Sequence, residues 1–293
     1  MTCRTGRYTE LRDALARRVL TLDGAMGTAV MDRCPPGGCV DMLSLSAPGL
    51  VGAVHRSYLE SGADIIRANT FNANRLTISR YGSVDTLRGL NATGVAIARA
   101  EAARMEAADP SRPRFVAGTM GPLLSPDPDA AAEQSAVLMD NGVDLLILET
   151  CYDAQILDAQ LRGVRRATAG RGLPVPVFVS VTISGQSGRL HSGHTLADVL
   201  EIVRPYDIDA LGLNCDAPVA SLRELAAISP LPTIYYPNAG APGAYKSADQ
   251  FVGEIRPLLA ESLLNIVGGC CGTDSHCIRH LSRLASRANP RRP

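Results

Sequence analysis

The chain has 293 residues, 46% of them hydrophobic, so it can bury a large core and is not a disordered segment. Lys and Arg number 29 and Asp and Glu also number 29, so the formal net charge is zero. This balance gives no indication of the basic surface of a nucleic-acid-binding protein or of a protein that binds anionic membranes. No hydrophobic run approaches the roughly 20 residues that cross a bilayer, and the polar segment 1–18 lacks the hydrophobic core of a signal peptide. We therefore expect a cytoplasmic protein with no nucleic-acid or membrane partner.

The chain alternates between short hydrophobic segments and longer segments with helical periodicity. A first helix is predicted over residues 9–18, and it precedes the first strand. The predicted strands are 19–24, 63–71, 114–121, 143–150, 177–183, 210–216, 233–240 and 265–272. The helices predicted between and after these strands are 50–62, 128–142, 195–206, 216–228, 247–262 and 273–287. Thr273 and Asp274 are both good N-cap residues for the last of these helices.

Eight strands that alternate with helices over about 250 residues predict a (β/α)8 TIM barrel of the α/β class. The alternative is a doubly wound open sheet, but no GxGxxG motif follows the first strand, which weakens its dinucleotide-binding form. No linker or change in composition interrupts the chain, so residues 1–293 are predicted to form a single domain. Segment 31–49 is long and rich in Pro and Gly, and we expect it to cover the mouth of the barrel.

Polar and reactive residues stand where the predicted strands end. They are Asp23, Gly24, Asn69, Thr70, Glu149, Thr150, Asn214, Cys215, Asn238, Cys270 and Cys271. The carboxyl ends of the strands in a (β/α)8 barrel meet at one face, which is where such folds place their active sites. The sequence therefore predicts a site that contains two carboxylates, several amides and three cysteines.

Three of the cysteines form a candidate metal site. Eight cysteines in a chain of this length are not a disulfide scaffold, so each is a buried hydrophobic residue, a nucleophile or a metal ligand. Three thiolates suit zinc, and three protein ligands leave the fourth position open, as in catalytic zinc sites. The glycines of GGCCG allow Cys270 and Cys271 to point at one ion. We interpret Cys215, Cys270 and Cys271 as zinc ligands; the alternative is a buried free cysteine and a chance doublet.

The remaining cysteines are interpreted mainly as ordinary residues. Cys34 and Cys39 flank a Pro-Pro-Gly-Gly segment, and a second metal there is the less favoured interpretation because no companion pair of ligands is nearby. Cys151 follows directly on Glu149 and Thr150 and belongs either to the core or to the site.

Asp23 and Glu149 each end a hydrophobic strand, where an unpaired charge would be costly. Neither residue has a Lys or Arg beside it in the sequence. An ammonium group supplied by a ligand is therefore one candidate partner for these carboxylates. Helix capping or ordinary loop hydrogen bonds are the alternative.

Six segments together resemble the homocysteine S-methyltransferases: LDGAMGT, ADIIRANTFNAN, LILETCYDA, GLNCDAP, YPNAGAP and NIVGGCCGT. They occur in this order between about residues 17 and 287, and the combination of GxNC with GGCCG is highly specific. Within the family, the sequences of these segments are most similar to the homocysteine-binding module of cobalamin-dependent methionine synthase. The resemblance implies a (β/α)8 barrel with a Zn²⁺ ion held by Cys215, Cys270 and Cys271.

The resemblance also implies how the substrate binds. Asp23 and Glu149 would hold the amino group of homocysteine, and Asn238 is a candidate fourth zinc ligand when substrate is absent. The carboxylate of homocysteine would bind the backbone amides of the turn formed by Gly24, Ala25, Met26, Gly27 and Thr28. Zinc would stabilise the homocysteine thiolate, and the net charge of −1 on a Zn(Cys)3 unit would keep this sulfur nucleophilic. The sulfur would then attack an electrophilic methyl group to give methionine.

The methyl donor is not specified by these motifs. The chain ends at Pro293 shortly after the last predicted helix, so we expect no folate or cobalamin module. The donor is then a small onium compound (S-methylmethionine, S-adenosylmethionine or betaine) or a separate methylcorrinoid protein. Aromatic rings often recognise onium centres, and Tyr152, Tyr235 and Tyr236 are placed near the mouth. The alternatives are a non-catalytic module that binds homocysteine or zinc, and a methyltransferase for another thiol or selenol such as selenocysteine.

Overall fold

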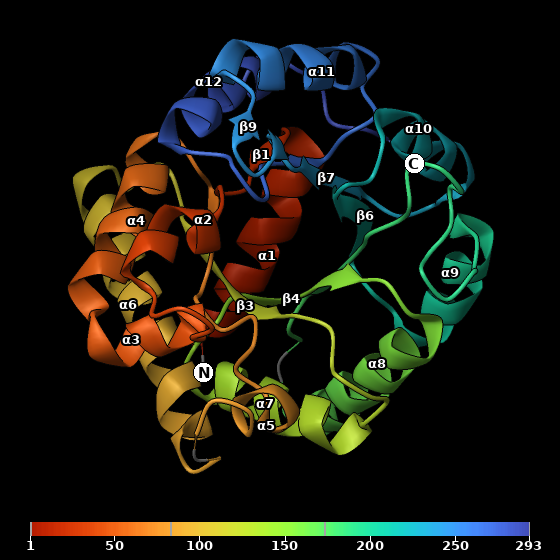
Figure 1. Cartoon of the computed structure of the whole chain (residues 1–293). Helices are drawn as coiled ribbons and strands as arrows, with labels where there is room; N and C mark the ends of the chain where they lie inside the picture. Colours follow the sequence, from red (N-terminus) through yellow and green to blue (C-terminus); the bar gives the residue numbers. More distant parts are fainter. Residues whose placement is uncertain (1, 83, 173, 293) are drawn as a thin grey trace.

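The computed structural model describes residues 2–82, 84–172 and 174–292 as a ring of eight parallel strands surrounded by helices (Figure 1). The strands are β1 (Leu20–Thr21), β2 (Ile65–Arg67), β3 (Phe115–Met120), β4 (Leu145–Cys151), β5 (Val177–Val181), β6 (Ala210–Cys215), β7 (Thr233–Pro237) and β10 (Ile266–Val267). They pair in the order β1-β10-β7-β6-β5-β4-β3-β2. A parallel bridge between Leu22 and Ile65 joins the two ends of this sheet and closes the ring. The predicted (β/α)8 barrel is confirmed, and every predicted strand segment overlaps one of these strands.

The α-helices are α1 (Thr2–Arg17), α2 (Met26–Val30), α3 (Leu43–Ser46), α4 (Pro48–Glu60), α5 (Arg75–Ile78), α6 (Thr86–Ala108), α7 (Pro128–Asp140), α8 (Ala154–Thr168), α9 (Leu196–Val203), α10 (Val219–Ile228), α11 (Ala248–Ala260) and α12 (Ser275–Ala285). Most of them pack around the outside of the ring, whereas α1 lies across one end of it and the short α2 lies on the inner side of α4 (Figure 1). Helices α6 and α8 occupy segments that the sequence analysis did not delimit. Asp274 accepts a hydrogen bond from the backbone N–H of Cys277 and so caps α12, as predicted.

Helix α1 closes the end of the barrel at which the strands begin. Its residues Leu11, Ala14 and Leu15 join the hydrophobic cluster that fills the inside of the barrel. On the same helix, the Arg7 side chain lies 3.3 Å from Asp144, the residue just before β4. The opposite end, where the strands finish, is therefore left for the functional site.

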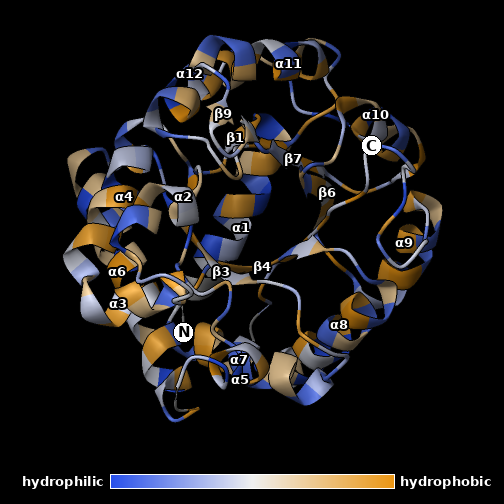
Figure 2. Ribbon diagram, in the orientation of Figure 1, coloured by the Kyte–Doolittle hydropathy of each residue, from blue (hydrophilic) through white to orange (hydrophobic). Residues whose placement is uncertain are grey.

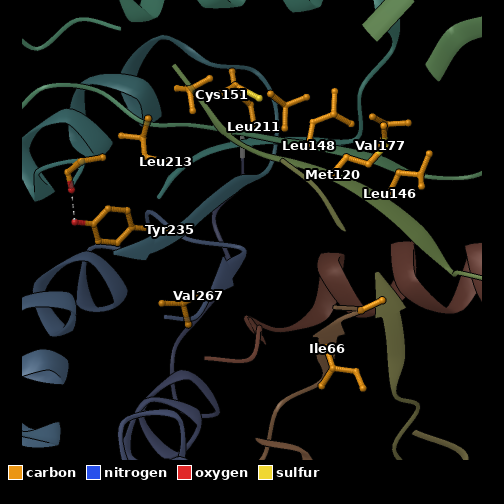
Figure 3. Packing of buried hydrophobic residues seen from close by; sticks show 14 of the residues in the cluster. Ile66, Met120, Leu146, Leu148, Cys151, Val177, Leu211, Leu213, Tyr235 and Val267 are labelled. Atoms are coloured by element: carbon orange, nitrogen blue, oxygen red, sulfur yellow. Dashed lines mark hydrogen bonds between the residues drawn. The ribbon is translucent and has the colours of Figure 1, made fainter. Parts of the chain in front are cut away.

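A second hydrophobic layer separates the strands from the helices. Leu146 and Leu148 point into this layer, whereas Leu145 and Ile147 of the same strand belong to the barrel interior, as the two-residue period of a strand requires. Figure 3 shows part of the layer, including Tyr235, whose hydroxyl donates a hydrogen bond to a carbonyl at 2.9 Å. Figure 2 shows that the surrounding helices carry both hydrophobic and hydrophilic residues, which suits helices with one face on the barrel.

The loops at the carboxyl ends of the strands are unequal in length. Segment 31–49, which follows β1 and α2, contains the 3-10 helices Met31–Arg33 and Val40–Met42 as well as α3. Val40 and Asp41 from this segment line the pocket at the barrel mouth, which agrees with the prediction that it covers the mouth. After β7 the chain forms a small antiparallel hairpin of β8 (Gly240–Ala241) and β9 (Ala244–Tyr245), which was not predicted. A third 3-10 helix, Arg204–Tyr206, follows α9. Across the described ranges, no helix combines the length and hydrophobicity needed to cross a bilayer.

Candidate active site

A pocket of about 350 Å³ lies at the carboxyl ends of the strands. The residues predicted from the sequence that line it are Asp23, Gly24, Ala25, Met26, Gly27, Thr28, Asn69, Glu149, Thr150, Cys215, Cys270 and Cys271. The fold therefore brings together residues from five strand ends that are up to 248 positions apart, as the sequence analysis expected. Arg67 and Asp41 also line the pocket, and neither had been named as a site residue.

The three thiols predicted to hold a metal interact with one another. The sulfur atoms of Cys215 and Cys270 are 3.3 Å apart. Hydrogen bonds from the thiols of Cys215 and Cys271 lower the pKa of Cys270 well below its ordinary value. The same contacts raise the pKa of both partner thiols. Of the three thiols, Cys270 is therefore the one whose ionised form the surrounding hydrogen bonds favour.

The chemistry of these three sulfurs and the spacing of two of them suit zinc. Two sulfurs bound at about 2.3 Å to a tetrahedral ion lie about 3.8 Å apart, close to the observed Cys215–Cys270 separation. Cys271 is exposed at the edge of the site. In the part of the chain that the structure describes, no three or more His, Cys, Asp or Glu side chains are already arranged as a metal site.

Asn214 fixes the backbone beside the thiols. Thr150 and Cys215, at the ends of β4 and β6, have φ values of 59° and 57°, which are uncommon for residues other than glycine and strained for a β-branched one. The buried Asn214 accepts from the Thr150 N–H (3.1 Å) and donates to its hydroxyl (2.8 Å). It also accepts from the Ser180 hydroxyl at 2.9 Å and donates to the Cys215 sulfur at 3.3 Å. One amide thus holds both strained residues and directs one thiol.

We expect Asn214→Ala to lower the free energy of unfolding by about 2–4 kcal/mol, because it leaves buried polar groups without partners and releases two strained residues. Urea denaturation measures the change. Asn289→Ala, at an exposed position, is the matched control and should change stability by less than about 0.5 kcal/mol. A similar small change for both variants would show that Asn214 does not support the site.

Arg67 bridges the two carboxylates that were expected to await a cation from a ligand. Its Nε donates to Asp23 Oδ1 at 2.7 Å and its Nη1 to Glu149 Oε2 at 2.8 Å. Its Nη2 donates to the backbone carbonyls of Gly24 (3.0 Å) and Gly269 (2.9 Å). Asp23 and Glu149 have no Lys or Arg beside them in the sequence, but the fold supplies Arg67 as their partner. The available signal was the charge of Arg67 directly after the hydrophobic pair Ile65 and Ile66, in the middle of the predicted strand segment 63–71.

The cluster of Asp23, Arg67 and Glu149 has a net charge of −1 when both carboxyls are ionised. Burial raises the pKa of both carboxyls, and the Arg67 charge opposes this rise. Burial also disfavours the charged guanidinium, but Glu149 and Asp23 outweigh it and hold the pKa of Arg67 well above its ordinary value. Among the described residues, nothing donates a hydrogen bond to Glu149 Oε1. One carboxylate oxygen thus remains available to a ligand.

Asp41 is a third carboxylate in the pocket. It is 1% exposed, and its Oδ2 accepts a hydrogen bond from the Asn72 N–H at 2.5 Å. Burial raises the pKa of Asp41 to about 7, although the Asn72 hydrogen bond opposes the shift. Asn69, after β2, holds the same segment in place because its amide donates to the Val40 carbonyl and the Ser44 hydroxyl, both at 3.1 Å.

This burial makes the stability of the ligand-free protein depend on pH. Between the ordinary carboxyl pKa of 3.8 and the folded value of about 7, the folded state keeps a proton that the unfolded state has released, so stability falls as pH rises. We expect Asp41→Asn to be more stable than the wild type at pH 8 by up to roughly 4 kcal/mol, and to match it near pH 4. Urea denaturation at the two pH values tests this, and an equal difference at both would contradict it.

Other predicted ligand-binding groups already have partners. Asn238 accepts from the Cys271 N–H at 3.0 Å and donates to Asp216 at 2.7 Å. It positions Cys271 here, and its role as a fourth zinc ligand stays a prediction. The Ala25 N–H donates to the Thr273 hydroxyl at 3.1 Å. Binding of a substrate carboxylate by the turn 24–28 also stays a prediction, and it would use the other amides of the turn.

Cys151 and the three tyrosines considered for the mouth differ in their burial. Cys151 is buried in the hydrophobic layer, and burial raises its pKa to about 12. Tyr235 and Tyr236 are also buried, and neither is among the residues that line the pocket, contrary to the prediction. The Tyr236 ring lies 4.9 Å from the guanidinium carbon of Arg67, which does line it. Tyr152 is half-buried, and its ring lies 6.3 Å from that of His191.

The fold and the pocket define a (β/α)8 barrel with a cysteine-rich site at the carboxyl ends of its strands. The family model described as "Homocysteine S-methyltransferase" matches residues 20–285. The chain therefore belongs to the homocysteine S-methyltransferase family.

Two curated relatives are named methionine synthase. That of Mycobacterium tuberculosis is 35% identical over 97% of this chain, and that of Mycobacterium leprae is 34% identical over 96%. The chain spans only about a quarter of the length of either, 26% and 25%. Among solved structures, the metallated form of the homocysteine methyltransferase MmuM from Escherichia coli has a TM-score of 0.79 at 24% identity, over 94% of this chain and 99% of its own. Its apo form has a TM-score of 0.74 at 26% identity, over 92% and 96%.

Proposed function

We propose that this chain transfers a methyl group to the sulfur of homocysteine, which gives methionine, and that Cys215, Cys270 and Cys271 hold a Zn²⁺ ion for this reaction. The observation that carries the proposal is the convergence of three interacting thiols and a buried, net negative cluster in one pocket. Membership of the family supports homocysteine as the acceptor. The metallated form of the Escherichia coli homocysteine methyltransferase supports a metal in the site.

Zinc, when bound, would stabilise the substrate sulfur as a thiolate at neutral pH, where a free thiol with a pKa of about 8.5 is mostly protonated. The residues of the chain do the binding and orienting. The free Oε1 of Glu149 offers an acceptor to an ammonium group, and the net charge of the cluster attracts it. Asn214 directs the Cys215 sulfur, and Val40 and Asp41 of segment 31–49 line the pocket.

The methyl donor in this proposal is S-methylmethionine, S-adenosylmethionine, betaine or a methylcorrinoid protein. Aromatic side chains that would recognise an onium centre are few near the site: Phe71 lines the pocket, and Tyr152 lies at the end of β4. This scarcity favours a donor that is not held by an aromatic cage.

A second candidate acceptor is another thiol or a selenol such as selenocysteine. Arg67 favours it, because the guanidinium occupies Asp23 and shares Glu149, the two residues expected to hold the homocysteine amino group. Arg67 would interfere less with the binding of a substrate whose amino group does not need to reach Asp23 and Glu149.

The test is turnover by the zinc-loaded protein with homocysteine or selenocysteine as acceptor and each donor in turn, including methylcobalamin. The proposal expects methionine, detected by mass spectrometry, with at least one donor. If zinc and homocysteine bind but no donor gives a methylated product, the non-catalytic binding module is the correct interpretation. Methylation of selenocysteine alone would establish the second candidate.

A further inference from the structure

The charges of the pocket are unevenly compensated. Three carboxylates line it, namely Asp23, Glu149 and Asp41. The first two share Arg67 at 2.7 and 2.8 Å. Asp41 forms no ion pair within the described ranges, and a backbone N–H, that of Asn72, is its hydrogen-bond donor. Asp41 is therefore the carboxylate of the pocket with the least compensation of its charge.

The position of Asp41 suits ligand binding. The side chain lines the pocket although the residue is 1% exposed. One oxygen, Oδ2, is held by the Asn72 N–H, whereas Oδ1 accepts no hydrogen bond from the described residues. A buried carboxylate with a free oxygen is costly unless a cation or donor reaches it. The bonds from Asn69 to the same segment keep this oxygen in place.

We propose that Asp41 pairs with the positive charge of a bound ligand, either the ammonium of the acceptor thiol or the onium centre of the methyl donor. This inference rests on the proposed function, because it assumes that the pocket binds these molecules. It adds a binding residue from the loop 31–49 to a site otherwise built from strand ends and the turn 24–28. Asp23 is then mainly a support for Arg67, and Glu149 Oε1 assists Asp41 or binds the other charge.

The experiment measures ligand affinity by calorimetry with the zinc-loaded protein, wild type and Asp41→Asn. The probes are homocysteine, 4-mercaptobutanoate, which lacks the ammonium group, and the trimethylsulfonium ion, which is an onium centre alone. If Asp41 holds the ammonium, Asp41→Asn lowers the affinity for homocysteine at least tenfold and the affinity for 4-mercaptobutanoate less than threefold. If it holds the onium centre, trimethylsulfonium binding weakens at least tenfold and homocysteine binding is unchanged.

Asp32→Asn is the matched control, because Asp32 lies in the same segment with its side chain 77% exposed; it should leave all three affinities unchanged. Asp41→Glu retains the charge and separates a binding role from a structural one, since it should keep the preference for a cationic probe even if the fold is weakened. Equal affinities of wild type and Asp41→Asn for every probe, including no binding, overturn the assignment. If the wild type binds homocysteine and Asp41→Asn changes the affinity for none of the three probes, this inference alone is overturned, whereas no binding of either thiol by the wild type removes the proposed function as well.

Discussion

Replacing Arg67 with methionine is expected to lower the free energy of unfolding by about 3–5 kcal/mol. The guanidinium is buried, and it contacts both Asp23 and Glu149 as well as two backbone carbonyls. Without it, two buried carboxylates lie close together with no counter-charge, and this costs much more than the loss of an exposed ion pair. Urea denaturation at pH 7.5 measures the effect.

The dependence on pH provides a second check of the Arg67 variant. Burial already raises the pKa of Asp23 and Glu149 in the wild type, and removing Arg67 takes away the charge that opposes the rise. The folded variant therefore binds protons more tightly, so its stability deficit should shrink as pH falls. Arg17→Met is the control, because this arginine is 74% exposed and its ion pair with Asp13 is on the surface. A deficit below about 1 kcal/mol that does not vary with pH would contradict the role of Arg67.

Cys215→Ser is expected to reduce zinc affinity and methyl transfer on the order of 10³-fold, since it removes one of three thiolates from the proposed zinc site. The sulfur of this residue is the one that Asn214 directs toward Cys270. Zinc retained after dialysis, measured by mass spectrometry, and turnover with homocysteine report the effect.

The matched control for that substitution is Cys151→Ser. Cys151 ends β4 near the pocket, but it is buried in the hydrophobic layer and forms no disulfide with any of the three thiols. The control should retain its zinc. Loss of zinc from both variants, or from neither, would show that the proposed ligand set is incorrect.

Much of the fold was predictable because a closed parallel barrel requires a repeated pattern of buried strands and amphipathic helices. Helices α6 and α8 fit this pattern, although their limits were not assigned from the sequence. The hairpin of β8 and β9 was missed because each of its strands has only two residues, which is too short for any period to show.

The site was predictable to the extent that it consists of residues at strand ends. Cys215, Cys270 and Glu149 could be placed together because all strands of the barrel finish at one face. Arg67 was missed because its partners belong to other strands, and a sequence neighbourhood cannot reveal pairs formed across the ring. Asp41 was missed because segment 31–49 has no periodicity from which the direction of a side chain can be inferred.

The central claim is that three cysteines at the barrel mouth hold a zinc ion that accepts the sulfur of the substrate. X-ray absorption at the zinc edge, recorded for the zinc-loaded protein before and after addition of homocysteine, tests it most directly. We expect three sulfur neighbours and one lighter atom before addition, and four sulfur neighbours afterwards. Failure to retain zinc, or a sulfur count that homocysteine does not change, would contradict the claim.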